Sequence, residues 1–467
     1  MLATKTFTKA KFTFAWMLTV VLLLTTAVNA VAAGYPTAAQ RNVAAEAYKG
    51  AYIIDAGAVT GTATTQTIAQ GIKPYGLIYA LVKAKVPVKW IINPNKTDAV
   101  TNATLTAVNQ TTGNSGVDFT YDCDGAGAGV AKKYRTGAFI IPKEFAQQAA
   151  SIVTTWRAKG VTVDGPCVAD TGNLPVYGTI AGWPKAILDA QNGAVAVNYF
   201  NNAEIPAPPT TLNPLDPPAY RFAAPSQLTP CDDIYIMPHA DPKWATHKEL
   251  LPFVNAGGSF YASCHAVSEV ENLEDPATPG VKVMNFLTTN GMIHYSQHSQ
   301  GSIPYQFFKS SADSTAWKNS AAANIDELPV GDPVAQFLGT TDAATQQGSE
   351  QIYIPKTGSA YRPTTQLITY DPTWSNSSSG GAATATSGPA SSLMYGPAFG
   401  NKGLVMYQGG HSVNKGTAAD VAAQRAFFNF LLLSAVDRRI NLSDVSRSPQ
   451  VVVTEPATGA SIQGGQS

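Results

Sequence analysis

Short apolar runs alternate with longer amphipathic stretches along residues 51–180 and again along residues 183–437, and this alternation limits the folds that the chain can adopt. Short runs rich in branched apolar residues are typical of buried strands, whereas apolar residues spaced three and four apart are typical of helices. Strands that alternate with helices predict parallel βαβ units. We therefore expect an α/β fold, with a mostly parallel sheet over residues 183–437 preceded by a second α/β domain over residues 34–182.

A chain of 467 residues exceeds what one hydrophobic core ordinarily organises, so at least two domains are expected. The proline-rich stretch at 205–230 predicts an irregular loop, and residues 290–400 predict a region rich in β-strands and loops. Residues 438–467 are expected to form a linker or tail.

The first 33 residues are typical of a secretory signal peptide. Lys5, Lys9 and Lys11 precede an apolar run at 15–24, and small residues follow it. An uncleaved membrane anchor is the alternative, although no second apolar run reaches the roughly 20 residues that span a bilayer. We expect an exported protein, secreted, periplasmic or at the cell surface, that has no membrane contact once the signal is removed.

The charge of the chain limits its partners. Charged residues make up 13% of the chain, and their charges cancel to zero. Without a basic stripe or an acidic tract, nucleic acid is not expected as a partner. A small molecule, a peptide or a glycan stays open as ligand, as does assembly into a homo-oligomer. No cofactor is expected.

Four cysteines in an exported chain raise the question of disulfides. Cys231 precedes one expected strand and Cys264 follows the next, so in parallel neighbours the two sulfur atoms would lie on the order of 20 Å apart, beyond the reach of a disulfide. Cys123 and Cys167 could pair, but the spacing of the cysteines does not fix their connectivity.

The segment "GGSFYASCHAV" at 257–267 places Cys264 between an expected strand and an expected helix. This is the local order of a nucleophile elbow, which raises a side chain above the carboxyl ends of parallel strands, where ligands bind. A helix start also favours a thiolate. The alternative is a buried cysteine that serves packing alone.

Three segments together resemble the class I glutamine amidotransferase-like superfamily: "DDIYIMPHADPKW" at 232–244, "FVNAGGSFYASCHAV" at 253–267 and "GNKGLVMYQGGHS" at 400–412. The Cys-His doublet is most similar to the intracellular-protease-like (PfpI) branch, and the Gly-Gly-His ending is similar to ThuA-like proteins. The resemblance covers residues 183–437 and implies a Rossmann-like sheet there.

The resemblance also implies roles for single residues. Cys264 would be the nucleophile and His265 its base, as the doublet implies. His411 follows the last strand, where amidotransferases keep a catalytic histidine, but the acid that follows in the superfamily is missing here. Asp189, at the end of the first strand of the domain, would supply the acid.

Two further residues would line the same sheet edge and contact substrate. His239 stands where relatives carry a glycine-rich oxyanion loop, and Gly410 precedes His411. The convergence of His239, His265 and His411 on one edge favours a site over scattered core histidines. The resulting expectation is a cysteine hydrolase of amide or related acyl bonds, and a non-catalytic binding or scaffold protein is the alternative.

No metal site is expected, because the candidate ligands lack a spacing signature. A set formed by His239, Cys264, His265 and His411 is chemically feasible. His294 and His298 are four apart, but without a helix this spacing does not indicate zinc. Three other residues are expected at the surface, with one glutamate orienting His265 as the alternative: His247, Glu269 and Glu271.

Overall fold

The computed structural model describes the following residues: 49–60, 63–96, 116–125, 131–169, 174–211, 213, 216–293, 331–338, 350, 352–371, 375–376, 386–387, 389–411, 413 and 416–440. The predicted signal peptide, His294, His298 and residues 441–467 lie outside them. In the described part of the chain, no helix combines the length and the hydropathy that crossing a membrane requires.

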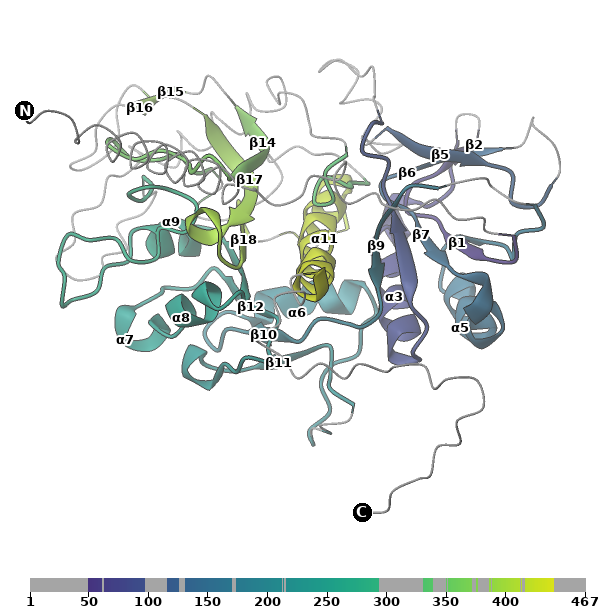
Figure 1. The fold of residues 1–467 in the computed structure, drawn as a ribbon, viewed down its shortest axis with the longest axis horizontal. Helices are drawn as coiled ribbons and strands as arrows, with labels where there is room; N and C mark the ends of the chain where they lie inside the picture. The colour runs from purple at the N-terminus through teal and green to yellow at the C-terminus, as the bar shows by residue number, and fades with distance from the viewer. Residues whose placement is uncertain are drawn as a thin grey trace, which may run out of the picture.

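A seven-stranded sheet organises the second half of the chain (Figure 1). Its strands, in spatial order, are β11 (Tyr220–Phe222), β10 (Ala186–Leu188), β12 (Ile234–Pro238), β13 (Ser259–Ser263), β18 (Leu404–Gln408), β17 (Ala390–Pro397) and β14 (Gln366–Asp371). The first five run parallel, and β17 and β14 add an antiparallel edge. The expectation of a mostly parallel sheet is confirmed.

Alternate side chains of the central strands pack on opposite faces of this sheet, as the two-residue period of a strand requires. Ile234 and Ile236 of β12 join a core with α6 (Ala194–Asn202) and α11 (Ala418–Ile440), whereas Tyr235 and Met237 join a core with α8 (Leu250–Asn255) and α9 (His265–Glu271). Because both faces are covered, the strands read as continuous apolar runs. A short helix, α7 (Trp244–His247), precedes α8.

The predicted loop at 205–230 contains one strand, so that expectation was wrong in part. Tyr220 pairs in parallel with Ala186, which makes β11 the edge of the sheet. A strand of three residues between proline-rich segments is too short to show a period. The last helix, α11, ends at Ile440 and so extends into the predicted tail.

The first half of the chain is also α/β, but its main sheet is antiparallel, which corrects the expected parallel units. Its spatial order is β8 (Val163–Asp164), β1 (Tyr52–Ile54), β7 (Phe139–Ile141), β4 (Val88–Ile91) and β9 (Val176–Ile180). Helix α3 (Lys73–Lys83) links β1 to β4, and α5 (Ala146–Ala158) links β7 to β8. The two strands that each helix joins run in the same direction, but another strand lies between them in the sheet: β7 lies between β1 and β4, and β1 lies between β7 and β8. This is the arrangement of split βαβ units.

One face of this antiparallel sheet packs on α3 and α5, and the other packs on a small sheet. The small sheet has the order β3 (Ala63–Thr64), β2 (Val59–Thr60), β6 (Lys132–Arg135) and β5 (Val117–Tyr121). A disulfide joins Cys123 to Cys167 beside this core, and neither Cys231 nor Cys264 is in a disulfide. The expected exclusion of a bond between Cys231 and Cys264 is confirmed.

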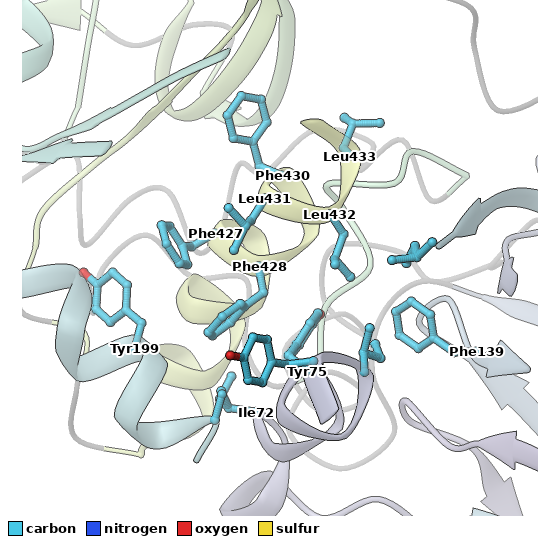
Figure 2. Packing of buried hydrophobic residues seen from close by; sticks show 14 of the residues in the cluster. Ile72, Tyr75, Phe139, Tyr199, Phe427, Phe428, Phe430, Leu431, Leu432 and Leu433 are labelled. Atoms are coloured by element: carbon cyan, nitrogen blue, oxygen red, sulfur yellow. The ribbon is translucent and has the colours of Figure 1, made fainter. Parts of the chain in front are cut away.

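Helix α11 lies between the two large sheets and joins their cores (Figure 1). Figure 2 shows its aromatic and aliphatic side chains against α3 and α6, with Phe428 stacked on Tyr75 at a ring distance of 4.8 Å. The buried Arg425 of α11 donates to the carbonyl of Ala56, which follows β1. The two α/β parts therefore share one continuous hydrophobic core.

Candidate functional site

Three neighbouring parallel strands end at the same level, and the candidate residues follow these ends. In the sheet register Pro238 of β12 lies opposite Ser263 of β13, and Ser263 lies opposite Gln408 of β18. His239 and Cys264 are the next residues of the first two strands. The register therefore places His239 and Cys264 side by side at this edge of the sheet.

Cys264 joins β13 to α9 with φ 59° and ψ −145°. This region is strained for any residue with a Cβ atom. Hydrogen bonds hold the residue in place: its N–H donates to Gln408 O at 3.1 Å, and its carbonyl accepts from the Tyr353 hydroxyl at 3.0 Å. The expected position of Cys264, between the end of a strand and the start of a helix, is confirmed.

His239 and Glu350 both contact the thiol of Cys264, which is fully buried. His239 Nδ1 lies 3.4 Å from Sγ, and the backbone N–H of Glu350 donates to Sγ at 3.4 Å. His239 also has a positive φ of 49°, and its N–H donates to Ser263 O at 3.0 Å. Asn192 donates to its carbonyl. His239 thus brings an imidazole into contact with the sulfur, whereas the sequence assigned the role of base to His265.

His265 contacts an acid that sequence reasoning missed. Its Nε2 lies 2.9 Å from Asp241 Oδ1, and its ring meets the ring of His239 edge-on at 4.4 Å. Asp241 follows His239 by two residues in "PHADP", so its place in the same loop was the available signal. The pair His265–Asp241 stands beside the contact between His239 and Cys264.

His411 reaches the same cluster from the end of β18, as expected. Its ring lies on that of His239, with a centroid distance of 3.9 Å and an interplanar angle of 37°. Burial, together with the nearby imidazoles of His239 and His265, lowers the pKa of His411 to about 4. Its Nδ1 is buried and has no hydrogen-bond partner among the described residues.

Gly410 supports the site through its backbone. It has a φ of 67°, and its N–H donates to the carbonyl of Glu350 at 2.8 Å. This bond holds the residue whose own N–H contacts the thiol. The structure therefore gives Gly410 a positioning contact, while its expected contact with substrate stays a prediction.

Asp189 is hydrogen-bonded within a network of Tyr235, Gln191 and His247, and its expected role beside Cys264 stays a prediction. Its carboxylate accepts from the Tyr235 hydroxyl at 2.6 Å and from the N–H of Gln191, and it lies 3.3 Å from His247 Nε2. Burial raises the pKa of Asp189, but the bonds from His247, Tyr235 and Gln191 outweigh it and keep that pKa below its ordinary value. His247, expected at the surface, is buried here as the partner of Asp189.

Glu269 and Glu271 are also buried, contrary to the expectation of surface positions. Glu271 accepts from the N–H of Leu287 and from the Tyr407 hydroxyl, so it fastens the segment after α9 to the sheet. Glu269 lies near His265: carboxylate and imidazole ligand atoms of Asp241, His265 and Glu269 lie within 4.8 Å of one another. All seven residues of α9 are buried, so the helix face that was expected to contact solvent is covered.

The cluster also has the composition of a metal site. One ligand atom from each of His239, Cys264 and His265 lies within 4.8 Å of the other two. Thiolate and imidazole are the ligands that zinc prefers. The sequence carried no spacing signature for this set because the residues come from two strand ends.

Comparisons with known proteins add no assignment. No protein-family model matches this chain, and no curated protein matches it.

Proposed function

We propose that this chain is an exported cysteine hydrolase that cleaves amide or related acyl bonds, with a Rossmann-like, amidotransferase-like fold over residues 183–437. The observation that carries the proposal is the contact of 3.4 Å between His239 Nδ1 and Cys264 Sγ. Nucleophile and base within hydrogen-bond reach, at the carboxyl edge of parallel strands, are the basic requirement for covalent catalysis.

The contacts of the thiol favour its reactive form. An imidazole and a backbone N–H both face Sγ, and both stabilise a thiolate over a thiol. In the proposed reaction, His239 takes the thiol proton through Nδ1 while Sγ attacks the carbonyl carbon of the substrate. The same proton then passes to the leaving group, and the acyl group stays on the sulfur. A water molecule, deprotonated by His239, releases the acid and restores the thiol.

His265 and Asp241 act as positioning residues in this scheme. The bond between His265 Nε2 and Asp241 Oδ1 fixes the His265 ring, whose edge-on contact at 4.4 Å limits rotation of His239. The tilted ring of His411, at 3.9 Å, limits it from another side. A base held on two sides needs little reorganisation when the substrate arrives.

Export is supported by one covalent observation. The disulfide between Cys123 and Cys167 is a bond that persists in oxidising compartments outside the cytoplasm. The lysine-flanked apolar run at 15–24 and the low content of charged residues point the same way. The proposed reaction uses no cofactor.

A non-catalytic binding protein is the second candidate, and the burial of Cys264 favours it. The side chain of Cys264 has no exposed surface, so a substrate carbonyl reaches Sγ only after neighbouring groups move. In this alternative the histidine-lined edge would bind a small molecule, a peptide or a glycan without chemistry.

Alkylation separates the two candidates. Wild-type protein and the variants Cys264→Ser and Cys231→Ser are treated with iodoacetamide at neutral pH, and the modified residue is identified by peptide mass spectrometry. The hydrolase predicts rapid alkylation of Cys264 in the folded protein. It also predicts hydrolysis of a panel of p-nitrophenyl esters and p-nitroanilides by wild type and Cys231→Ser but not by Cys264→Ser. An inert Cys264 together with no turnover in the panel would favour the binding protein.

A further inference from the structure

We propose that His239, Cys264 and His265 bind a thiophilic divalent metal ion, with Zn²⁺ as the expected occupant. The site shares the contact between His239 and Cys264 with the hydrolase proposal, but it requires only that the three side chains can surround an ion. Its consequence for activity rests on the proposed function, since the ion would bind the thiolate that the hydrolase needs.

The distances fit tetrahedral coordination. With Zn–S near 2.3 Å and Zn–N near 2.0–2.1 Å, a sulfur and a nitrogen on one tetrahedral ion lie roughly 3.5 Å apart. His239 Nδ1 and Cys264 Sγ already lie 3.4 Å apart. The ligand atom of His265 lies within 4.8 Å of both, a gap that small side-chain rotations can close.

The ligands stand on a rigid frame. His239 and Cys264 follow adjacent strands in fixed register, and both backbones are held by hydrogen bonds to a neighbouring strand. His265 begins α9 directly after Cys264. A site preorganised in this way needs little ordering when the ion binds.

The surroundings of His265 resemble the outer partners of metal-bound histidines. Its Nε2 lies 2.9 Å from a carboxylate oxygen of Asp241, an arrangement that fixes the ring and increases the basicity of the other nitrogen. With Nε2 on Asp241, Nδ1 is the nitrogen assigned to the ion. Three protein ligands leave a fourth position for water or substrate.

Binding involves no redox change. The ion takes the sulfur as thiolate, so the proton of the Cys264 thiol is released to solvent and the Zn–S bond forms in its place. Both imidazoles bind as neutral ligands. In the hydrolase scheme, one equivalent of Zn²⁺ would therefore block attack by Sγ, and a chelator would restore it.

Cobalt substitution tests the site without any assay of activity. Protein freed of metal with EDTA is titrated with Co²⁺, whose thiolate charge-transfer and d–d absorption report sulfur ligation and tetrahedral geometry. Wild type and the matched control Cys231→Ser should bind one equivalent with both signals. Cys264→Ser should lose the charge-transfer absorption, and His239→Ala should weaken binding at least ~100-fold, since even loss of an outer-shell partner costs 10–100-fold.

A second measurement uses wild-type protein only, so it tests the metal site even if the variants fail to fold. In wild-type protein, one equivalent of Zn²⁺ should protect Cys264 but not the exposed Cys231 from iodoacetamide, and EDTA should reverse the protection. The proposal is overturned by absent Co²⁺ absorption with unprotected Cys264. It is also overturned if Cys264→Ser binds as wild type does while Asp241→Asn does not, which would move the ion to Asp241, His265 and Glu269. If the protein binds one equivalent of Co²⁺ but, when freed of metal, hydrolyses no substrate, the hydrolase proposal is rejected and the metal site stands.

Discussion

His239 and Cys264 leave adjacent parallel strands at the same level, and both do so with positive φ, 49° and 59° respectively. Residues with a Cβ atom adopt this conformation at a cost, and such strain gathers at functional sites. Two strained residues in contact through Nδ1 and Sγ indicate that the surrounding hydrogen bonds hold both side chains at this edge against the local preference of the backbone.

The strain at Cys264 predicts an unusual order of stabilities. Cys264→Gly should be more stable than Cys264→Ala by about 1 kcal/mol, because glycine adopts positive φ without a Cβ clash and this relief exceeds its extra freedom in the unfolded chain. Urea unfolding of both variants measures the difference. As a control, Ala262→Gly in β13 should have a lower free energy of unfolding than wild type, because glycine weakens an ordinary strand. An alanine variant at 264 as stable as the glycine variant would mean that the strain is negligible.

The assignment of His239 as the base predicts a larger loss of activity when His239 is replaced than when the pair of His265 and Asp241 is disturbed. His239→Gln should lower kcat by at least about 100-fold, the range of general-base catalysis, and should slow alkylation of Cys264. Asp241→Asn should have a smaller effect, because Asp241 acts only through the ring of His265. Initial rates with an activated ester and the pH profile of alkylation measure both. A larger loss in His265→Gln than in His239→Gln would return the role of base to His265.

The sequence was sufficient to predict which edge of the sheet carries the site. Buried central strands such as β12 and β13 appear as unbroken apolar runs, so their ends, and hence the positions of His239 and Cys264, follow from the residues alone. The contact that selects His239 over His265 did not follow, because it depends on the register between two strands and on a positive φ. Neither is encoded in a local pattern.

For the antiparallel sheet, by contrast, the sequence did not predict the order of the strands. Apolar runs and amphipathic stretches alternate along residues 51–180, as strands and helices do in the structure, yet β7 lies between β1 and β4. Each βα connection is locally the same in a parallel and in a split arrangement, so periodicity cannot distinguish them. The burial of His247 was missed for a related reason: its partner Asp189 is 58 residues away in the chain.

A buried ion pair predicts a large loss of stability in the first α/β part. Lys96 Nζ lies 2.8 Å from Asp118 Oδ1, and both side chains are fully buried. Lys96→Met should cost roughly 3–5 kcal/mol, because it leaves the carboxylate buried without its cation. Lys83→Met, which breaks the partly exposed pair with Asp216, should cost no more than about 1 kcal/mol. Equal midpoints of chemical unfolding for the two variants would contradict this view of the buried pair.

Asp55 predicts a dependence of stability on pH. Its buried carboxyl accepts from the N–H groups of Gly57 and Ala58 and from the Thr65 hydroxyl, while Asp164 and Lys132 lie near it with opposite charges. Burial raises the pKa of Asp55 to about 6, against 3.8 for the ordinary group, and the two backbone bonds offset only part of this effect.

Between about pH 4 and pH 6 the folded protein therefore holds a proton at Asp55 that the unfolded chain releases, so this group's contribution to stability falls as the pH rises through that window. The full loss is about 3 kcal/mol by pH 7. Asp55→Asn keeps the shape and an acceptor oxygen but removes the titration. The free energy of unfolding of the variant, relative to wild type, should improve by about 2 kcal/mol from pH 4 to pH 7, as measured by urea unfolding at each pH, because the unfolded carboxyl is already partly ionised at pH 4. A difference between the two proteins that stays constant over this range would show that Asp55 does not titrate there.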